Sequence, residues 1–104
     1  MSLTAYSIQQ IKFEYFSYIK EFGARMDQWV MGVATEPEQA LLNLGVDLVE
    51  DIWMWKPALS PQAARTVLDF FATRYRVQVA PEAQRGVRPH CIYLYKTPIF
   101  SKRS

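Results

Sequence analysis

The stretch that decides the fold is Trp29-Val30-Met31-Gly32-Val33-Ala34-Thr35-Glu36-Pro37-Glu38. Its first part, together with Gln28, is short and almost continuously apolar, and its bulky and β-branched residues predict a buried central strand. Gly32 inside this strand predicts a bulge or the close approach of another group to the backbone. Thr35 and Glu38 have the spacing of a capping box, and Pro37 is tolerated only in a first helical turn. We therefore expect a short helix that begins here and ends at Gly45.

Residues 4–22, which precede this stretch, predict an N-terminal helix. Apolar side chains recur there at helical spacing, with polar residues largely between them. Thr4 or Ser7 would cap the beginning, and Gly23 suits the left-handed conformation that ends many helices. The aromatic residues of this helix indicate that it packs on the core or forms a dimer face.

The chain after Gly45 alternates strands and helices. We expect a strand from about Glu50 that Lys56-Pro57 ends, and a helix that Ser60-Pro61 begins and that runs to about Thr73. Residues 76–79 form a strand or an irregular extension, residues 80–89 a surface loop, and residues 90–95 the last strand. This order predicts an α/β (α+β) fold: a small, mainly antiparallel sheet of three to four strands flanked by helices, with an extra N-terminal helix.

Length and composition predict one domain over residues 1–104. Half of the residues are hydrophobic, which is enough apolar surface to form a core without a metal or a disulfide. The single cysteine, Cys91, excludes an intrachain disulfide, and no apolar run approaches the length of a membrane span. The N-terminus lacks the features of a signal peptide. We therefore expect a cytoplasmic protein that does not associate with membranes.

Charge is divided unevenly along the chain. Residues 1–52 carry three basic and eight acidic side chains, whereas residues 53–104 carry nine basic and two acidic ones. Such asymmetry indicates either that the two halves attract each other across the fold or that one face binds a polyanion such as a nucleic acid. The candidate phosphate contacts are Arg74, Arg76, Arg85, Arg88 and Lys96.

No complete set of metal-binding or catalytic residues is evident. The single histidine, His90, precedes Cys91 in a predicted strand, so their side chains point to opposite faces and cannot share a metal or act together in nucleophilic catalysis. Glycine-rich phosphate-binding motifs are absent. We expect no cofactor and no metal, and we interpret the acidic pairs Glu36/Glu38 and Glu50/Asp51 as a helix cap and the beginning of a strand.

The aromatic residues predict either core packing or a contact surface. Trp53 and Trp55 share one face of their predicted strand and Met54 takes the other, so both faces of the strand are apolar, which predicts a sheet covered on both sides. With Trp29, Tyr93 and Tyr95 they could also form a stacking platform for a flat ligand. The candidate interface residues are Tyr15, Tyr18, Phe22, Trp53 and Trp55.

The segment from Trp29 to Leu41 resembles the second half of the GIY-YIG endonuclease module. In that family a strand that ends in tyrosine–aliphatic–glycine leads into a capped helix. The resemblance continues through residues 60–71, which look like a later helix of the family, and through residues 92–98, which look like the closing strand of some small bacterial GIY-YIG-like proteins. It thus covers residues 27–98 as an order of elements, and it leaves residues 4–22 as an added helix and residues 99–104 as a basic tail.

The resemblance implies a scaffold without the nuclease chemistry. The family is thought to use tyrosines, an arginine on the helix and a glutamate that holds a divalent metal. Aligned on Gly32, these positions hold Val30, Ala40 and Leu68, with Asp69 beside the last of them. Phe22-Gly23-Ala24 is at most a faint counterpart of the first motif. The family activity is therefore not expected.

Three functions follow as hypotheses. The first is a non-catalytic binding or protein-interaction domain on a GIY-YIG-like scaffold, with a protein partner or a second copy of the chain. The second is nucleic-acid binding without cleavage, which requires the basic residues to lie on one face. The third is a residual metal-dependent nuclease in which Asp69 binds the metal and Arg65 or Arg74 replaces the family's arginine.

Overall fold

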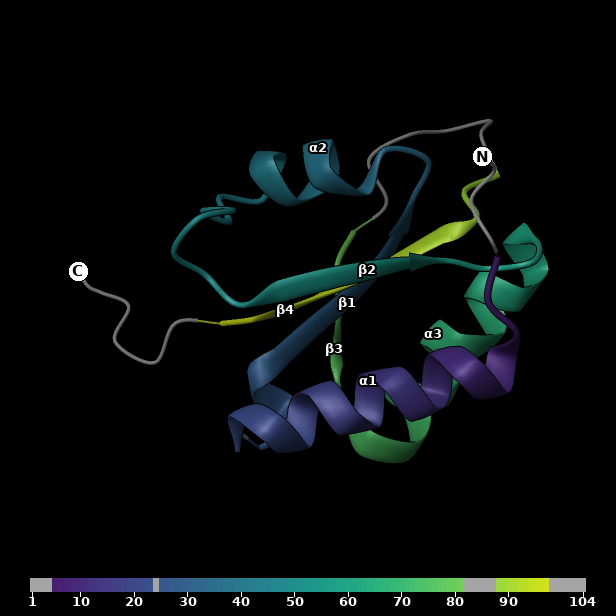
Figure 1. Cartoon of the computed structure of the whole chain (residues 1–104), viewed down its shortest axis with the longest axis horizontal. Helices are drawn as coiled ribbons and strands as arrows, with labels where there is room; N and C mark the ends of the chain where they lie inside the picture. The colour runs from purple at the N-terminus through teal and green to yellow at the C-terminus, as the bar shows by residue number, and fades with distance from the viewer. Residues whose placement is uncertain (1–4, 24, 82–87, 98–104) are drawn as a thin grey trace.

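The computed structural model describes residues 5–23, 25–81 and 88–97. In these residues, three α-helices are interspersed along the chain with the strands of a four-stranded mixed sheet (Figure 1). This arrangement confirms the predicted α+β class. The elements are α1 (Ile8–Phe22), the 3-10 turn η1 (Met26–Gln28), β1 (Trp29–Ala34), α2 (Pro37–Asn43), β2 (Trp53–Pro57), α3 (Pro61–Tyr75), β3 (Gln78–Val79) and β4 (Cys91–Lys96).

The strand order in the sheet is β2-β4-β1-β3. β4 is antiparallel to both of its neighbours, β1 and β2, whereas β1 and β3 are parallel. The longest ladder joins β1 to β4, with Trp29 opposite Lys96 and Ala34 opposite Cys91. β2 therefore lies at one edge of the sheet and β3, with only two residues, at the other.

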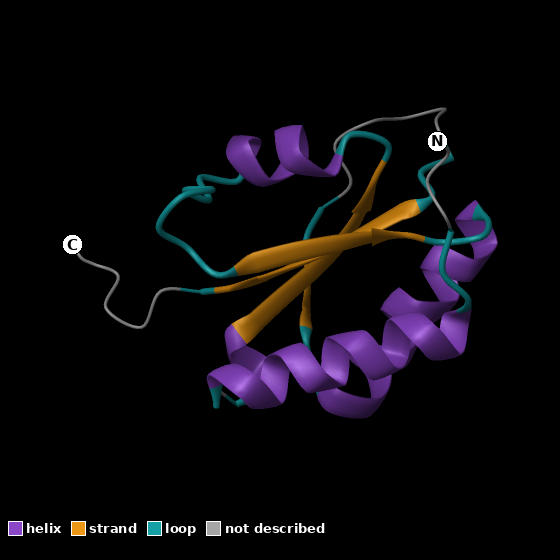
Figure 2. Cartoon of the chain, in the orientation of Figure 1, coloured by secondary structure: helices purple, strands orange, loops and turns teal. Residues whose placement is uncertain are grey.

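Helices cover both faces of the sheet, as Figure 2 shows. α1 and α3 pack on one face, where Met31 and Leu94 are buried with Phe71. α2 covers the opposite face, where Leu41 packs with Val30 and Tyr93. Residues of β1 alternate between the two clusters because successive side chains of a strand point to opposite faces. The prediction that both faces are covered is confirmed.

The ends of the two long helices follow the sequence signals. Ser7 accepts a hydrogen bond from the Gln10 amide and forms a capping box, and Gly23 ends α1 with a left-handed φ of 65°. Ser60 accepts from the Ala63 amide at the beginning of α3. α3 runs two residues beyond the expected Thr73, and Arg76 takes the left-handed position after it with a φ of 61°.

α2 begins one residue later than a helix capped by Thr35 would. The residue that precedes the helix is Glu36, which makes no side-chain cap hydrogen bond, and Pro37 takes the first helical position. A proline disfavours the helical conformation of the residue before it. Glu36 therefore cannot be the first residue of the helix, as a cap at Thr35 would require. Gly45 follows the end of the helix with a φ of 90°.

β2 begins later than the sequence suggests, at Trp53 instead of about Glu50. Asp47 accepts hydrogen bonds from the Val49 and Glu50 amides, and Asp51 accepts one from the Asp47 amide. Such aspartate-capped turns compete with strand pairing. At its other end β2 includes Lys56 and Pro57, which we expected to end it, because an edge strand accommodates a proline whose nitrogen faces away from the sheet.

Gly32 allows the Tyr93 ring to lie against β1. The two residues are direct partners in the β1–β4 ladder, and a Cβ added at Gly32 would lie 2.3 Å from the Tyr93 hydroxyl oxygen. Tyr93 is almost fully buried in the cluster on the α2 side. Of the two alternatives predicted for Gly32, a bulge or a close approach, the structure shows the close approach.

No helix in the described part of the chain is long and apolar enough to span a bilayer. Residues 76–79 do contain a strand, although only Gln78 and Val79 belong to it. The basic tail at 99–104 and most of the expected loop at 80–89 lie outside the described residues.

Candidate functional site

The three positions that correspond to nuclease residues do not meet in one site. Val30 and Ala40 pack in the cluster between the sheet and α2. Leu68 is buried in the cluster that α1 and α3 form on the opposite face. The sheet therefore separates Leu68 from the other two, and all three positions are apolar. Asp69, beside Leu68, is exposed on α3.

The candidate phosphate contacts lie at both ends of the sheet. Lys96 ends β4 opposite Trp29, whereas Arg88 precedes the first residue of the same strand. Arg74 and Arg76 lie at the end of α3. Arg85 lies outside the described residues. The structure thus does not bring Arg88 and Lys96 to a common patch, as a single polyanion-binding face requires.

The apolar side of α1 is mostly occupied inside the chain, which corrects part of the predicted interface. Tyr15 is fully buried, and its hydroxyl donates to the Ile92 carbonyl oxygen. A residue in this position cannot contact a partner. Phe22 is 40% exposed, but its ring also contacts Trp29. Tyr18 is half-buried and reaches the edge of the sheet, where its hydroxyl donates to the Trp53 carbonyl oxygen over 2.8 Å.

Trp53 and Trp55 remain half-buried on the α2 side of the edge strand β2. The Trp53 indole donates to the Leu48 carbonyl oxygen over 2.9 Å. The Trp55 indole nitrogen lies 3.4 Å from Oε2 of Glu38, at the beginning of α2. Both rings are therefore oriented by a hydrogen bond and still offer surface to solvent. Of the predicted interface residues, these two are the ones that lie on an edge strand of the sheet.

Two residues of β2 turn backbone groups away from the sheet that find no partner in the described part of the chain. Lys96 donates its amide to the Ile52 carbonyl, and Ala58 donates its amide to the His90 carbonyl. In an antiparallel ladder, these bonds place the backbone N–H and C=O groups of Met54 and Lys56 toward β4. The N–H and C=O groups of Trp53 and Trp55 therefore point away from β4. Among the described residues, the Trp53 N–H and both backbone groups of Trp55 have no hydrogen-bond partner.

Two tyrosines close the ends of this open edge. The Tyr18 hydroxyl donates to the Trp53 carbonyl oxygen at the beginning of β2. At the other end the Tyr6 amide donates to the Pro57 carbonyl over 2.8 Å, and Tyr6 forms a parallel bridge with Ala58. Figure 1 shows β2 crossing in front of the other strands. The edge that is free to pair is therefore centred on Trp53–Trp55.

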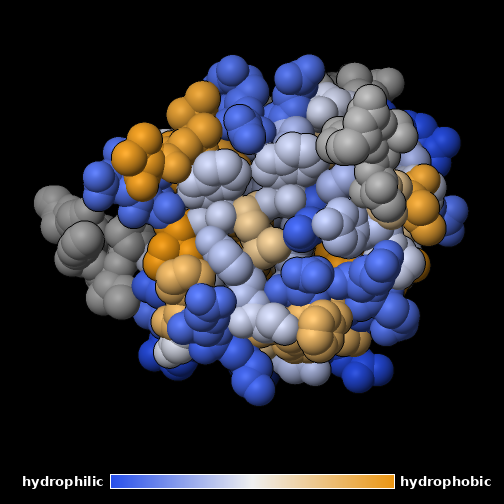
Figure 3. All heavy atoms as spheres, in the orientation of Figure 1, coloured by the Kyte–Doolittle hydropathy of each residue, from blue (hydrophilic) through white to orange (hydrophobic). Residues whose placement is uncertain are grey.

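The surface beside this edge is partly apolar. Figure 3, in the orientation of Figure 1, shows strongly apolar atoms gathered at the upper left, over α2 and the segment after it, with hydrophilic residues around them. Leu42 is 50% exposed and Val49 is 86% exposed. Exposed apolar side chains next to an open strand edge are typical of an interaction surface.

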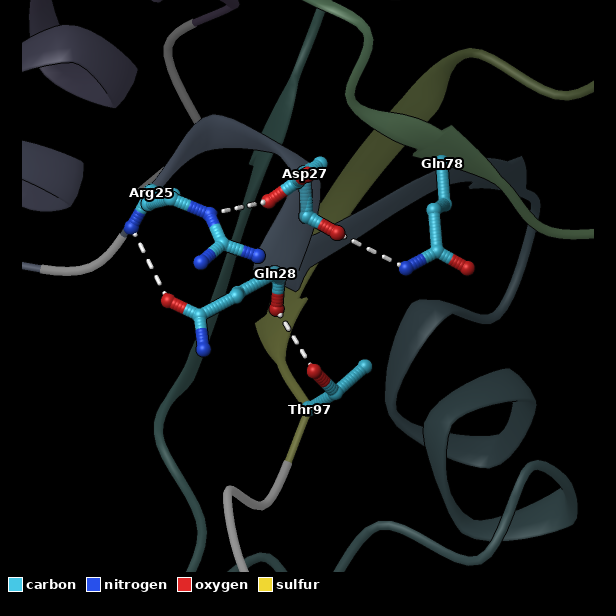
Figure 4. A network of polar contacts seen from close by, with 5 residues as sticks. All are labelled: Arg25, Asp27, Gln28, Gln78 and Thr97. Atoms are coloured by element: carbon cyan, nitrogen blue, oxygen red, sulfur yellow. Dashed lines mark hydrogen bonds and ion pairs between the residues drawn. The ribbon is translucent and has the colours of Figure 1, made fainter.

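A polar network at the other end of β1 has a structural role (Figure 4). The Arg25 guanidinium and the Asp27 carboxylate form an ion pair at 3.1 Å. Gln78 donates to the Asp27 carbonyl over 2.9 Å, and the Thr97 hydroxyl donates to the Gln28 carbonyl over 2.8 Å. These bonds satisfy the backbone of η1 and join it to β3 and to the end of β4. The network contains no group that is positioned for chemistry.

Burial governs the pKa shifts of the thiol and hydroxyl groups among the described residues. Burial raises the pKa of the Cys91 thiol above its ordinary value of 9.0, which lowers its nucleophilicity at neutral pH. Burial also raises the pKa of the hydroxyls of Tyr15, Tyr18 and Tyr95. In the described part of the chain, no three His, Cys, Asp or Glu residues are grouped so that they could hold a metal ion.

No family model, curated protein or solved structure matches this chain.

Proposed function

We propose that this chain is a non-catalytic protein-interaction domain that receives an extended segment of a partner protein as a new strand beside β2. The observation that carries the proposal is the open backbone edge at Trp53 and Trp55. An added strand would pair with these N–H and C=O groups, which supply affinity for any extended sequence. Side chains of the added strand would contact the two indole rings, which supply selectivity.

The opposite edge of the sheet is less suitable for strand addition. β3 has only two residues, and the Gln78 side chain already bonds the Asp27 carbonyl. β2 has five residues and two large half-buried rings on one face. Aromatic residues that are partly exposed and held in place are typical anchors of protein interfaces.

The proposal does not depend on the resemblance to GIY-YIG endonucleases, which stays a prediction. Val30 and Ala40 lie across the sheet from Leu68, so the positions named by that resemblance offer no joint site for a nucleophile and a metal. The separation of Arg88 from Lys96 likewise gives nucleic-acid binding no specific support.

A pair of substitutions at Trp55 tests strand addition. Trp55→Val removes the indole and keeps the outward N–H, whereas Trp55→Pro removes both, and an edge position tolerates the proline. Octapeptides selected from a random displayed library against the wild-type chain would be measured by fluorescence anisotropy on all three proteins. We expect the selected peptides to bind Trp55→Val measurably and to lose binding to Trp55→Pro, because only the proline interrupts the new ladder.

Circular dichroism and cooperative urea unfolding would establish that both variants are folded. Selected peptides that bind Trp55→Pro as well as they bind Trp55→Val would contradict strand addition at β2. A library that yields no binding peptide would contradict it too.

A further inference from the structure

The stretch of chain that forms η1, β1, α2 and most of β2 is acidic. No lysine or arginine occurs between Arg25 and Lys56, and this stretch carries six acidic residues. Glu38 is the one whose position beside β2 is fixed by a contact, since its Oε2 lies 3.4 Å from the Trp55 indole nitrogen. Glu38 is exposed, and among the described residues no basic side chain pairs with it. Its negative charge is therefore not neutralised within the described fold.

The other side of the same edge carries a positive charge. Lys56 extends toward the α1 side, where its Nζ lies 4.6 Å from the centre of the Tyr6 ring and 3.5 Å from the Tyr6 hydroxyl. Successive side chains of a strand point to opposite faces. An added strand would thus meet a carboxylate and two indoles on one side and an ammonium group on the other.

We propose that the segment received by β2 carries a lysine or an arginine on the side that faces α2, at the position opposite Trp55. This inference rests on the proposed function, because it specifies the sequence of the added strand. Side chains directly opposite each other in a ladder lie about 5 Å apart. A cation at this position reaches both the face of the Trp55 ring and the Glu38 carboxylate, which attract it together.

Lys56 determines which face of the added segment carries the basic residues. A basic residue on the α1 side of the added strand would approach the Lys56 ammonium group, and like charges across a ladder are unfavourable. The partner segment therefore alternates, with basic residues toward α2 and neutral or acidic residues toward α1. This pattern distinguishes the proposed segment from a run of consecutive basic residues.

Four synthetic octapeptides with blocked ends test the inference. Threonine alternates with arginine in the first, with glutamine in the second and with glutamate in the third. The fourth has four threonines followed by four arginines, so that it has the charge of the first peptide without its alternation. Binding would be measured by fluorescence anisotropy to the wild-type chain, to Trp55→Pro, to Glu38→Gln and to Asp69→Asn. The last variant makes the same change of charge on α3, on the other side of the sheet.

We expect the alternating arginine peptide to bind the wild-type chain about tenfold more tightly than the glutamine peptide or the block peptide. Glu38→Gln should remove most of that advantage, and Asp69→Asn should preserve it. Equal binding of the alternating and block peptides, or an unchanged advantage in Glu38→Gln, would overturn the inference.

The same measurements separate this inference from the function on which it rests. If the arginine and glutamine peptides bind equally well and Trp55→Pro abolishes both, strand addition stands and the preference for a basic residue fails. If none of the four peptides binds the wild-type chain while library-selected peptides bind it and lose binding to Trp55→Pro, the preference for a basic residue fails and strand addition stands. If the library also yields no binding peptide, both proposals fail.

Discussion

A few residues of this chain have close contacts that allow little change at their positions. Gly32 is the clearest, because the Tyr93 ring occupies the space where a Cβ would lie. Tyr15 is another, since it crosses the core to bond the Ile92 carbonyl of the sheet. Each position makes a prediction that one substitution tests.

Replacing Gly32 with alanine should destabilise the fold. The new methyl group would lie within 2.4 Å of two Tyr93 atoms, so the ring or the strand must move. Such overpacking of a core costs about 1–3 kcal/mol. Urea unfolding of Gly32→Ala measures the loss, and the same substitution in a Tyr93→Leu background is the control. A cost that is equal in both backgrounds would show that Tyr93 is not the cause.

The buried Tyr15 hydroxyl should make the protein unstable in alkali. Burial raises the pKa of this hydroxyl well above its ordinary value of 10.0. The unfolded chain therefore releases this proton at a lower pH than the folded chain does, and stability is full below about pH 10 and falls as pH rises above that value. Urea unfolding between pH 8 and pH 11 measures the fall.

Tyr15→Phe is the control for this pH dependence. It should lower stability at neutral pH by about 1 kcal/mol, because the Ile92 carbonyl loses a donor. Its alkaline decline should be shallower than that of the wild type, with the remainder due to Tyr18 and Tyr95, whose pKa values burial also raises. An identical slope in both proteins would refute the role of Tyr15.

Among the elements, β2 has two contrasting edges, one that pairs with β4 and one that points away from the sheet. Its inner groups pair with β4, whereas the Trp53 N–H and both backbone groups of Trp55 point outward and have no described partner. Edge strands often carry lysine and proline, which discourage uncontrolled pairing. Lys56 and Pro57 limit β2 in this way, and Tyr6 covers the Pro57 carbonyl. The open length is therefore short and suits one specific segment.

Amide hydrogen exchange should alternate along β2. The Met54 and Lys56 amides donate to β4 and should exchange slowly, whereas the Trp53 and Trp55 amides face outward and should exchange fast. Two-dimensional NMR after transfer to heavy water measures the four rates. A selected peptide should slow exchange at Trp55 and leave Met54 unchanged. Slow exchange at Trp55 in the free chain would mean that the edge is already covered.

At the scale of the whole molecule, charge and packing oppose self-association. The fully buried residues of α1, such as Tyr15, are used inside the chain, and each copy would present the same carboxylate beside Trp55. The ion pair between Arg25 and Asp27 lies within the acidic half of the sequence. It therefore gives no support to the idea that the two halves attract each other.

We therefore expect the free chain to be a monomer of 12.1 kDa. Light scattering coupled to gel filtration at micromolar concentration and physiological salt measures the mass. A dimer that Trp55→Pro dissociates would show instead that β2 pairs with a second copy. Trp55→Val is again the control, because it keeps the outward N–H.

Local chemistry in the sequence determined much of the fold. Ser7, Gly23 and Ser60 have capping roles that depend on neighbouring backbone groups, and the short apolar run at 29–34 forms the buried strand that its bulky and β-branched residues predict. The same local reasoning failed at Thr35 and at the beginning of β2. There, Pro37 restricted the residue before it, and the carboxylates of Asp47 and Asp51 competed for the backbone.

Only the tertiary structure decided which strand lies at the edge and which aromatic residues stay accessible. Tyr15 and Trp55 are both aromatic residues on apolar faces, and their sequence patterns do not distinguish them. The packing of α1 on the sheet buries the first, and the strand order β2-β4-β1-β3 leaves the second on an edge strand. Strand order depends on contacts between residues far apart in the chain, for which periodicity and spacing carry no signal.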